Sequence, residues 1–372
     1  MRELGPETLK RLTAQTGFPR VTIQAAMERR GAEVRKNHIV LANATTKAVR
    51  RMVELGMSEA DATAFMQPII DLSADEHAME RQNDGMSIFV DDAGYEVMQL
   101  PMALDERVSV GNRFSVAQLV EPAVMNAEFA VLALSQGGVG LYRCTRFTGE
   151  YVELEGLPED ICYVLRYDQF DKSSGHHHTV SARGDAAHHG HGLGKDEHDA
   201  FVKRFVDAVK PRVDAWIVKA KLPLVLIGSE DVLGMYRKEN TYAATVDEYR
   251  HVDPHAISLD ELIDVGWSCM KPRAEAWRHE AIDRFHASRH KAVDVYGVLP
   301  ALREGRVASL FVDPAHEIAG VFDTDTNEIH VDRAPTGVSE NLVDVAVAFA
   351  LEYGVEIVPI TGELDTPAAI LH

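Results

Sequence analysis

The segment from His176 to His198 most restricts how this chain can fold. It reads HHHTVSARGDAAHHGHGLGKDEH and holds seven of the 17 histidines of the 372-residue chain. Only five of its 23 side chains are apolar, and four of these are Ala or Val. So little apolar surface cannot offset the entropy lost on ordering a polar, glycine-containing segment. We therefore expect a mobile loop, and a loop of this length inside a folded domain is usually functional.

Regular elements are expected on both sides of this loop. Three β-rich runs between Glu128 and Glu155 predict an antiparallel meander before it. Apolar residues at helical spacing predict a long helix over about 195–220 after it. The strand expected over 222–227 is too apolar for a sheet edge and should lie centrally. A further helical region is expected to end near Gly266, giving a layered α/β domain.

The flanking blocks have different patterns. The first is expected to be α+β, with a strand at 18–27, helices around 45–55 and from Ser58, and a strand pair over 87–101. The third opens with a helix over about 271–290 and then alternates short strands with helices, which predicts an α/β/α sandwich. The pattern changes predict three domains, at residues 1–122, 123–266 and 267–372.

Composition excludes several classes of protein. A net charge of −20 disfavours indiscriminate nucleic-acid binding. No apolar run approaches the roughly 20 residues that span a bilayer, and the opening MRELGPETLKRL lacks a secretory pattern. We therefore expect a cytoplasmic protein with no membrane partner. The distant cysteines Cys144, Cys162 and Cys269 form no CxxC pair and are interpreted as reduced thiols.

Basic residues gather in the first block. One group lies between Arg29 and Lys36, and a second shares a helix face at i, i+3 and i+4 spacing. Two interpretations stay open: a solvated helix face, or a patch that contacts RNA. The candidate contacts are Arg29, Arg30, Lys47, Arg50 and Arg51.

The end of the histidine-rich loop has a composition suited to RNA. Its glycines let backbones approach closely, and its cationic and imidazole side chains can donate to phosphates or stack on bases. Salt screens the distant carboxylates of the acidic body within about 8 Å, so local charge dominates at contact. The candidate residues are His188, His189, Gly190, His191, Gly192, Gly194 and Lys195.

Other ligands for this loop are less well supported. The His189-Gly190-His191 run is chemically able to bind zinc or nickel, but nearby cysteine is absent and the glycines leave the site poorly preorganised. After Lys195, Asp196 stands where a phosphate-binding loop needs Ser or Thr for magnesium. We therefore expect no metal and no cofactor.

The order of the blocks resembles the archaeo-eukaryotic class I peptide-chain release factors and Pelota, specifically their bacterial relatives that include the hibernation factor Balon. The resemblance covers about residues 123–372 and, weakly, the first block. It implies a ribonuclease H-like middle domain with the His/Gly loop at 172–195, and a last domain similar to ribosomal proteins that bind kinked RNA. The matching runs are AVLALSQGGVGLYRC, HGHGLGKDEHDAFVKRFVDAV, PLVLIGSEDVLGMYRKEN and YGVLPALREGRVASLFV.

One departure from that family shapes the functional expectation. Release factors carry Gly-Gly-Gln in this loop, whereas residues 190–195 read GHGLGK and no Gly-Gly-Gln occurs in the chain. No stop-codon-reading segment is identifiable either. The resemblance therefore implies a factor that occupies the ribosomal A site for hibernation or rescue without releasing peptide. The first block would face the decoding site, the loop the peptidyl-transferase centre, and the last domain a partner such as elongation factor Tu.

Two alternatives remain open. One is a hydrolase of peptidyl-tRNA or nucleic acid that uses the histidine-rich loop, although a nuclease needs inward carboxylates and AVLALSQGGVGLYRC has none. The other is an adaptor that keeps only the fold. No catalytic residue is assigned, because Asp253-Pro254-His255 is typical of a turn and Ser229-Glu230-Asp231 of a helix cap. The sequence thus favours a non-enzymatic role.

Overall fold

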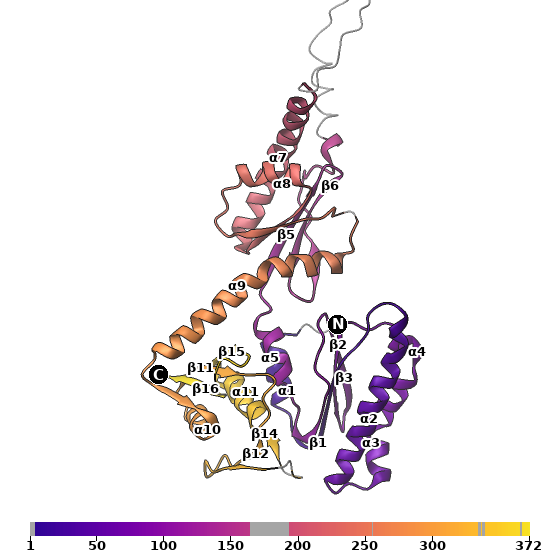
Figure 1. The fold of residues 1–372 in the computed structure, drawn as a ribbon, viewed down its shortest axis with the longest axis vertical. Helices are drawn as coiled ribbons and strands as arrows, with labels where there is room; N and C mark the ends of the chain where they lie inside the picture. The colour runs from indigo at the N-terminus through magenta and orange to yellow at the C-terminus, as the bar shows by residue number, and fades with distance from the viewer. Residues whose placement is uncertain (1–3, 164–192, 255, 334–335, 337–338, 365–366) are drawn as a thin grey trace, which may run out of the picture. The chain divides into compact units, whose positions relative to one another are not determined.

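The chain forms two compact units in a computed structural model, which describes residues 4–163, 193–254, 256–333, 336, 339–364 and 367–372 (Figure 1). Unit 1 combines Met1–Asn126 with Glu275–His372, and unit 2 is Ala127–Ala274. Each unit has its own sheets and its own buried core.

Unit 2 is built on a five-stranded sheet of order β7-β6-β5-β8-β9. The first three strands along the chain are antiparallel neighbours, while β8 and β9 run parallel to β5. The expected meander and the central place of the apolar strand β8 are confirmed. The strands are β5 (Phe129–Ser135), β6 (Gly138–Cys144), β7 (Gly149–Tyr151), β8 (Leu224–Gly228) and β9 (Thr245–His251).

Helices cover both faces of this sheet. Because strand side chains alternate between faces, Leu132 of β5 packs with helices α7 (Leu193–Ala220) and α8 (Glu230–Glu239). Val131 packs on the opposite face with the first half of α9 (Leu259–Ala287). The layered α/β prediction for this segment is therefore confirmed.

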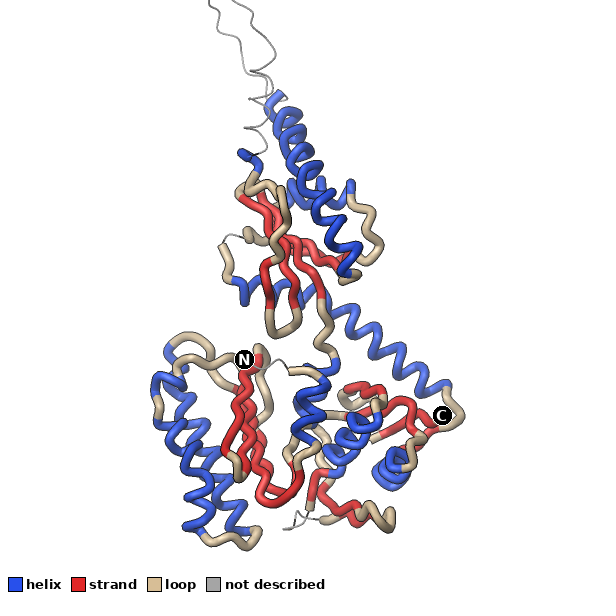
Figure 2. Tube along the Cα trace, turned by 180° about the vertical axis from the view of Figure 1, so that it is seen from behind, coloured by secondary structure: helices blue, strands red, loops and turns tan. Residues whose placement is uncertain are grey.

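The first segment of unit 1 is a four-stranded antiparallel sheet of order β3-β2-β1-β4. Helices α2 and α3 pack against this sheet and supply the other half of its core (Figure 2). Ser58 caps α3 by accepting a hydrogen bond from the Asp61 amide. The elements are α1 (Pro6–Thr13), β1 (Thr16–Ala26), η1 (Ala32–Lys36), α2 (Asn37–Glu54), α3 (Glu59–Ala74), α4 (Glu76–Met79), β2 (Gly85–Asp91), β3 (Gly94–Leu100), β4 (Arg107–Arg113) and α5 (Ala117–Val124).

The last segment of unit 1 has the sheet orders β10-β16-β11-β15 and β13-β12-β14. The end of α9 covers one face of the larger sheet, where Phe285 packs on Phe311 and Val358. Leu310 is equally buried on the other face, and α10 and α11 contact these strands. The elements are β10 (Lys291–Val293), α10 (Asp294–Arg303), β11 (Val307–Val312), β12 (Ala319–Phe322), β13 (Ile329–Val331), β14 (Glu340–Asn341), α11 (Leu342–Tyr353), β15 (Glu356–Pro359) and β16 (Ala368–Leu371).

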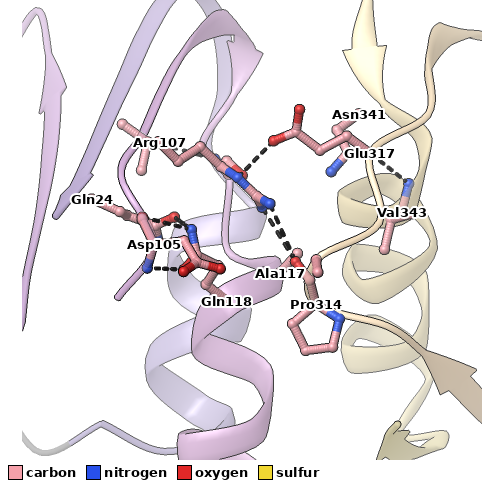
Figure 3. Close-up of polar contacts among 12 residues, drawn as sticks. Gln24, Asp105, Arg107, Ala117, Gln118, Pro314, Glu317, Asn341 and Val343 are labelled. Atoms are coloured by element: carbon pink, nitrogen blue, oxygen red, sulfur yellow. Dashed lines mark hydrogen bonds and ion pairs between the residues drawn. The ribbon is translucent and has the colours of Figure 1, made fainter. Parts of the chain in front are cut away.

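Polar contacts join the two segments of unit 1. Arg107 of β4 lies 2.6 Å from the Glu317 carboxylate and hydrogen-bonds the Pro314 carbonyl oxygen at 3.4 Å (Figure 3). Gln118 of α5 lies beside them and hydrogen-bonds Gln24 at 3.1 Å. Residues about 200 positions apart in the sequence thus share one polar cluster.

Two expectations about residues 229–290 differ from the structure. The helical region expected to end near Gly266 is wrong for Thr245–His251, which forms strand β9, because pairing with β8 overrides the local pattern. The helix expected from about residue 271 begins at Leu259. The domain boundaries expected near 122 and 267 therefore fall within helices α5 and α9.

Candidate functional site

The structure describes only the last residues of the histidine-rich segment, from residue 193 onward. His188, His189, Gly190, His191 and Gly192 lie outside the described residues. Gly194 and Lys195 belong to the first turn of α7, which begins at Leu193. RNA contact by this loop therefore stays a prediction.

The basic residues of the first block lie close to carboxylates. Lys47 of α2 forms an ion pair with Glu106, and Arg50 and Arg51 lie 3.0 and 3.3 Å from the two oxygens of Glu54. Hydrogen bonds from Arg51 and Arg50 hold the pKa of Glu54 below its usual range. These pairs reduce the local positive charge of the proposed patch.

The other two predicted contacts of this block lie on a separate element. Arg29 and Arg30 are in the connection between β1 and η1, where Arg30 is exposed and Arg29 half-buried. The solvated helix face and the RNA patch both remain open interpretations.

A polar cluster in unit 2 links the β5–β6 turn to helices α7 and α8. Asp231 accepts a hydrogen bond of 2.5 Å from Gln136 and lies 3.2 Å from Nε2 of His198. Burial on its own would raise the pKa of Asp231. Hydrogen bonds from the Ser229 hydroxyl, the Gln136 side chain, the Val232 amide and His198 lower the pKa by more than burial raises it. The pKa of Asp231 is therefore held below its usual range. Asp231 thus connects His198 of α7 and Gln136 of the β5–β6 turn with the start of α8.

A cavity opens beside this cluster, at the carboxyl ends of the three parallel strands. In α/β sheets this edge is the usual position of a ligand crevice. The cavity is wide open to solvent and has a volume of about 450 Å³. We call it the carboxyl-edge cavity; it is lined by Ser135, Gln136, Gly137, Gly228, Ser229, His251, Val252 and Asp253.

Gly228 permits the close packing at this cavity. A Cβ atom there would lie 1.7 Å from the carbonyl oxygen of Leu134, so no larger residue fits without moving a strand. Ser229 follows at the N-cap position of α8, but its hydroxyl accepts no hydrogen bond from the helix, so this part of the expected cap is wrong. The Asp231 carboxylate accepts a hydrogen bond from the Val232 amide, as the expected cap by carboxylates requires. The turn expected after His251 is confirmed by a hydrogen bond from the Ala256 amide to the Asp253 carbonyl.

Sequence reasoning missed Gln136, His198 and His251 as members of one region. The available signal was positional, since residues that directly follow parallel strands meet at one sheet edge. That signal requires knowing that β9 is a strand. Because strand β9 was not predicted, the cavity at its end could not be predicted either.

Across the described ranges, no three or more His, Cys, Asp or Glu side chains are grouped so as to hold a metal ion. Within the same ranges, no helix is long and apolar enough to cross a bilayer.

Comparisons with known proteins connect unit 2 to one family. Residues 129–272 match the model described as bacterial archaeo-eukaryotic release factor family 7. A search among curated proteins found no match.

Solved structures of archaeal proteins are similar to this chain at low sequence identity and low TM-score. Archaeoglobus fulgidus Pelota is 10% identical, covers 100% of this chain and 93% of its own, and has a TM-score of 0.35. The archaeal translation termination factor aRF1 is 11% identical, covers 99% and 98%, and has a TM-score of 0.23. A model of ribosome-bound archaeal Pelota and ABCE1 is 10% identical, covers 100% and 95%, and has a TM-score of 0.34.

Proposed function

We propose that this chain is a Pelota-like translation factor that binds the ribosome, because residues 129–272 match the model of bacterial archaeo-eukaryotic release factor family 7. The family match is the observation that carries the proposal. It covers the sheet, helix α8 and helix α7, and the His/Gly loop directly precedes α7.

The proposed role is occupation of the A site for hibernation or rescue, without peptide release. The absence of Gly-Gly-Gln supports this, since residues 190–195 offer imidazole and amino groups in place of the glutamine. Donors of this kind suit phosphate oxygens of ribosomal RNA. Elongation factor Tu is the proposed partner of the last segment, and the cytoplasm the proposed location.

Cosedimentation with vacant 70S ribosomes tests the proposal. The wild type is compared with a loop variant in which alanine replaces His188, His189, His191 and Lys195. The matched control removes three histidines and one lysine that are exposed elsewhere, by alanine at His77, His279, His316 and Lys219.

We expect the wild type and the control to sediment with ribosomes and the loop variant to bind at least about tenfold more weakly, with a shallower salt dependence. Absence of wild-type binding at low and moderate salt, with and without elongation factor Tu, would reject the ribosome role. A peptidyl-tRNA hydrolysis assay on the same samples separates the hydrolase alternative, because a non-releasing factor leaves the ester intact.

A further inference from the structure

We infer that the carboxyl-edge cavity binds an unpaired nucleobase, stacked on the ring of His251. None of the residues that line this site belongs to the histidine-rich segment or to the basic residues of the first block. The shared chemistry is a planar base, supplied either by a free nucleotide or by single-stranded RNA. The inference extends the proposed translation role but stands on its own geometry.

His251 is held in place by a ladder of side chains on β9 and α8. The guanidinium carbon of Arg237 lies 4.0 Å from the centroid of the Tyr249 ring. The Tyr249 and His251 rings meet edge to face, with centroids 5.1 Å apart. A cation over an aromatic face and an edge-to-face ring pair are both attractive arrangements. The exposed imidazole of His251 therefore projects from a supported position at the cavity wall.

The spacing along β9 explains why these two rings share a face. Side chains two residues apart on a strand point to the same side of the sheet. Tyr249 packs with the core beneath α8, so His251 lies on that side at the last residue of the strand. A base stacked on His251 would thus sit at the mouth of the cavity and not on the sheet face.

Charge at the cavity favours a base over a phosphate. Glu230 and Asp231 occupy the first turn of α8 and Asp253 lines the cavity, so an anion would meet carboxylates where a helix N-terminus otherwise attracts it. Carboxylate and carboxamide oxygens accept hydrogen bonds from exocyclic amino groups of bases. Asp253 and Gln136 therefore favour cytosine, adenine or guanine over uracil.

Binding of fluorescein-labelled seven-nucleotide single strands, followed by anisotropy, tests the inference. Homopolymers of cytidine, adenosine and uridine are compared with the mononucleotides CMP, AMP, GMP and UMP, which are measured by calorimetry. The variants are His251→Ala, His251→Phe, which keeps a stacking ring, and His279→Ala, an exposed histidine in unit 1 as control. Circular dichroism verifies that each variant is folded.

We expect His251→Ala to weaken binding by about tenfold or more, since stacking on a ring is worth that much per base. His251→Phe should restore most of the affinity, His279→Ala should leave it unchanged, and uridine should bind most weakly. Equal affinity for strands and mononucleotides would assign a free nucleotide as ligand, and preference for strands would assign RNA.

No binding by the wild type, or equal binding by the wild type and His251→Ala, would overturn the inference. A phenylalanine variant as weak as the alanine variant would also overturn it. Because ribosomes are absent from this assay, its failure is distinguishable from failure of the proposed ribosome role.

Discussion

The carboxylate of Asp344 accepts hydrogen bonds from the backbone amides of Val116 and Ala117, each at 2.8 Å. Val116 is the N-cap residue of α5 and has no side-chain oxygen to satisfy these amides. A side chain 228 positions away therefore caps the helix. This contact fastens α11 to α5 inside unit 1, where the positive charge of Arg107 also acts on Asp344.

Replacement of Asp344 by alanine should destabilise unit 1 by about 2–3 kcal/mol, because two buried amides lose their acceptor. Urea unfolding followed by circular dichroism measures the loss, and hydrogen exchange of the two amides should accelerate at least about tenfold. Glu352→Ala, an exposed change on the same helix, is the control and should cost less than about 0.5 kcal/mol. Unchanged exchange at Val116 and Ala117 would contradict the capping role.

Stability should also depend on pH through Asp344. Burial raises the pKa of this carboxyl above its usual range despite the hydrogen bonds from Val116, Ser115 and Ala117. The folded state therefore holds the proton more tightly than the unfolded chain, and stability falls as pH rises from the unfolded pKa through the raised folded pKa.

The Asp344→Asn variant tests this effect because it lacks the titrating group. The comparison includes the coupling of Asp344 to Glu340, whose pKa the Asp344 charge helps to raise, while carboxylates uncoupled to Asp344 cancel. We expect the stability of the wild type relative to Asp344→Asn to be greatest below the unfolded pKa of about 3.9, to decline as pH rises above it, and to level off above the folded pKa. Unfolding curves at several pH values measure the difference. A difference that grows with pH would contradict the assigned direction.

Two glycines of unit 2 should respond oppositely to alanine. Gly228→Ala places a Cβ against the Leu134 carbonyl and should cost at least about 3 kcal/mol. Gly234→Ala lies within α8 with open space around the new atom and should stabilise by roughly 0.5–1 kcal/mol. Thermal melting of the two variants gives the comparison, and a tolerated Gly228→Ala would mean that the strands separate easily.

The three cysteines should differ in reactivity. Cys162 is exposed, whereas burial raises the pKa of Cys144 to about 12 and also raises that of Cys269. Since the thiolate is the nucleophile, a thiol reagent at pH 8 should modify one cysteine rapidly in the native protein and the other two only on unfolding. Cys162→Ser should abolish the rapid phase. A rapid phase that persists in that variant would show that a buried thiol is accessible.

Local patterns were sufficient for much of the fold. The hairpin of β2 and β3 around Asp91–Gly94, the Ser58 cap and the apolar strand β8 each carry their signal in neighbouring residues. Strand β9 carries none, because its half-buried residues depend on pairing with β8. The cavity and the contacts among Arg237, Tyr249 and His251 could therefore not be predicted from the sequence. The histidine-rich loop was the main candidate site in the sequence, and its role stays a prediction.

The sequence by itself determined the element types wherever hydrophobic period and turn residues agree, the acidic net charge, and the lack of a Gly-Gly-Gln motif. Only the tertiary structure decided that Asp344 caps a helix far away in sequence, that Gln136 and His198 meet at Asp231, and that three strand ends line one open cavity. The physical reason is that period and propensity act over a few residues. Caps, ion pairs and cavities form between residues that only the folded chain brings within hydrogen-bond distance.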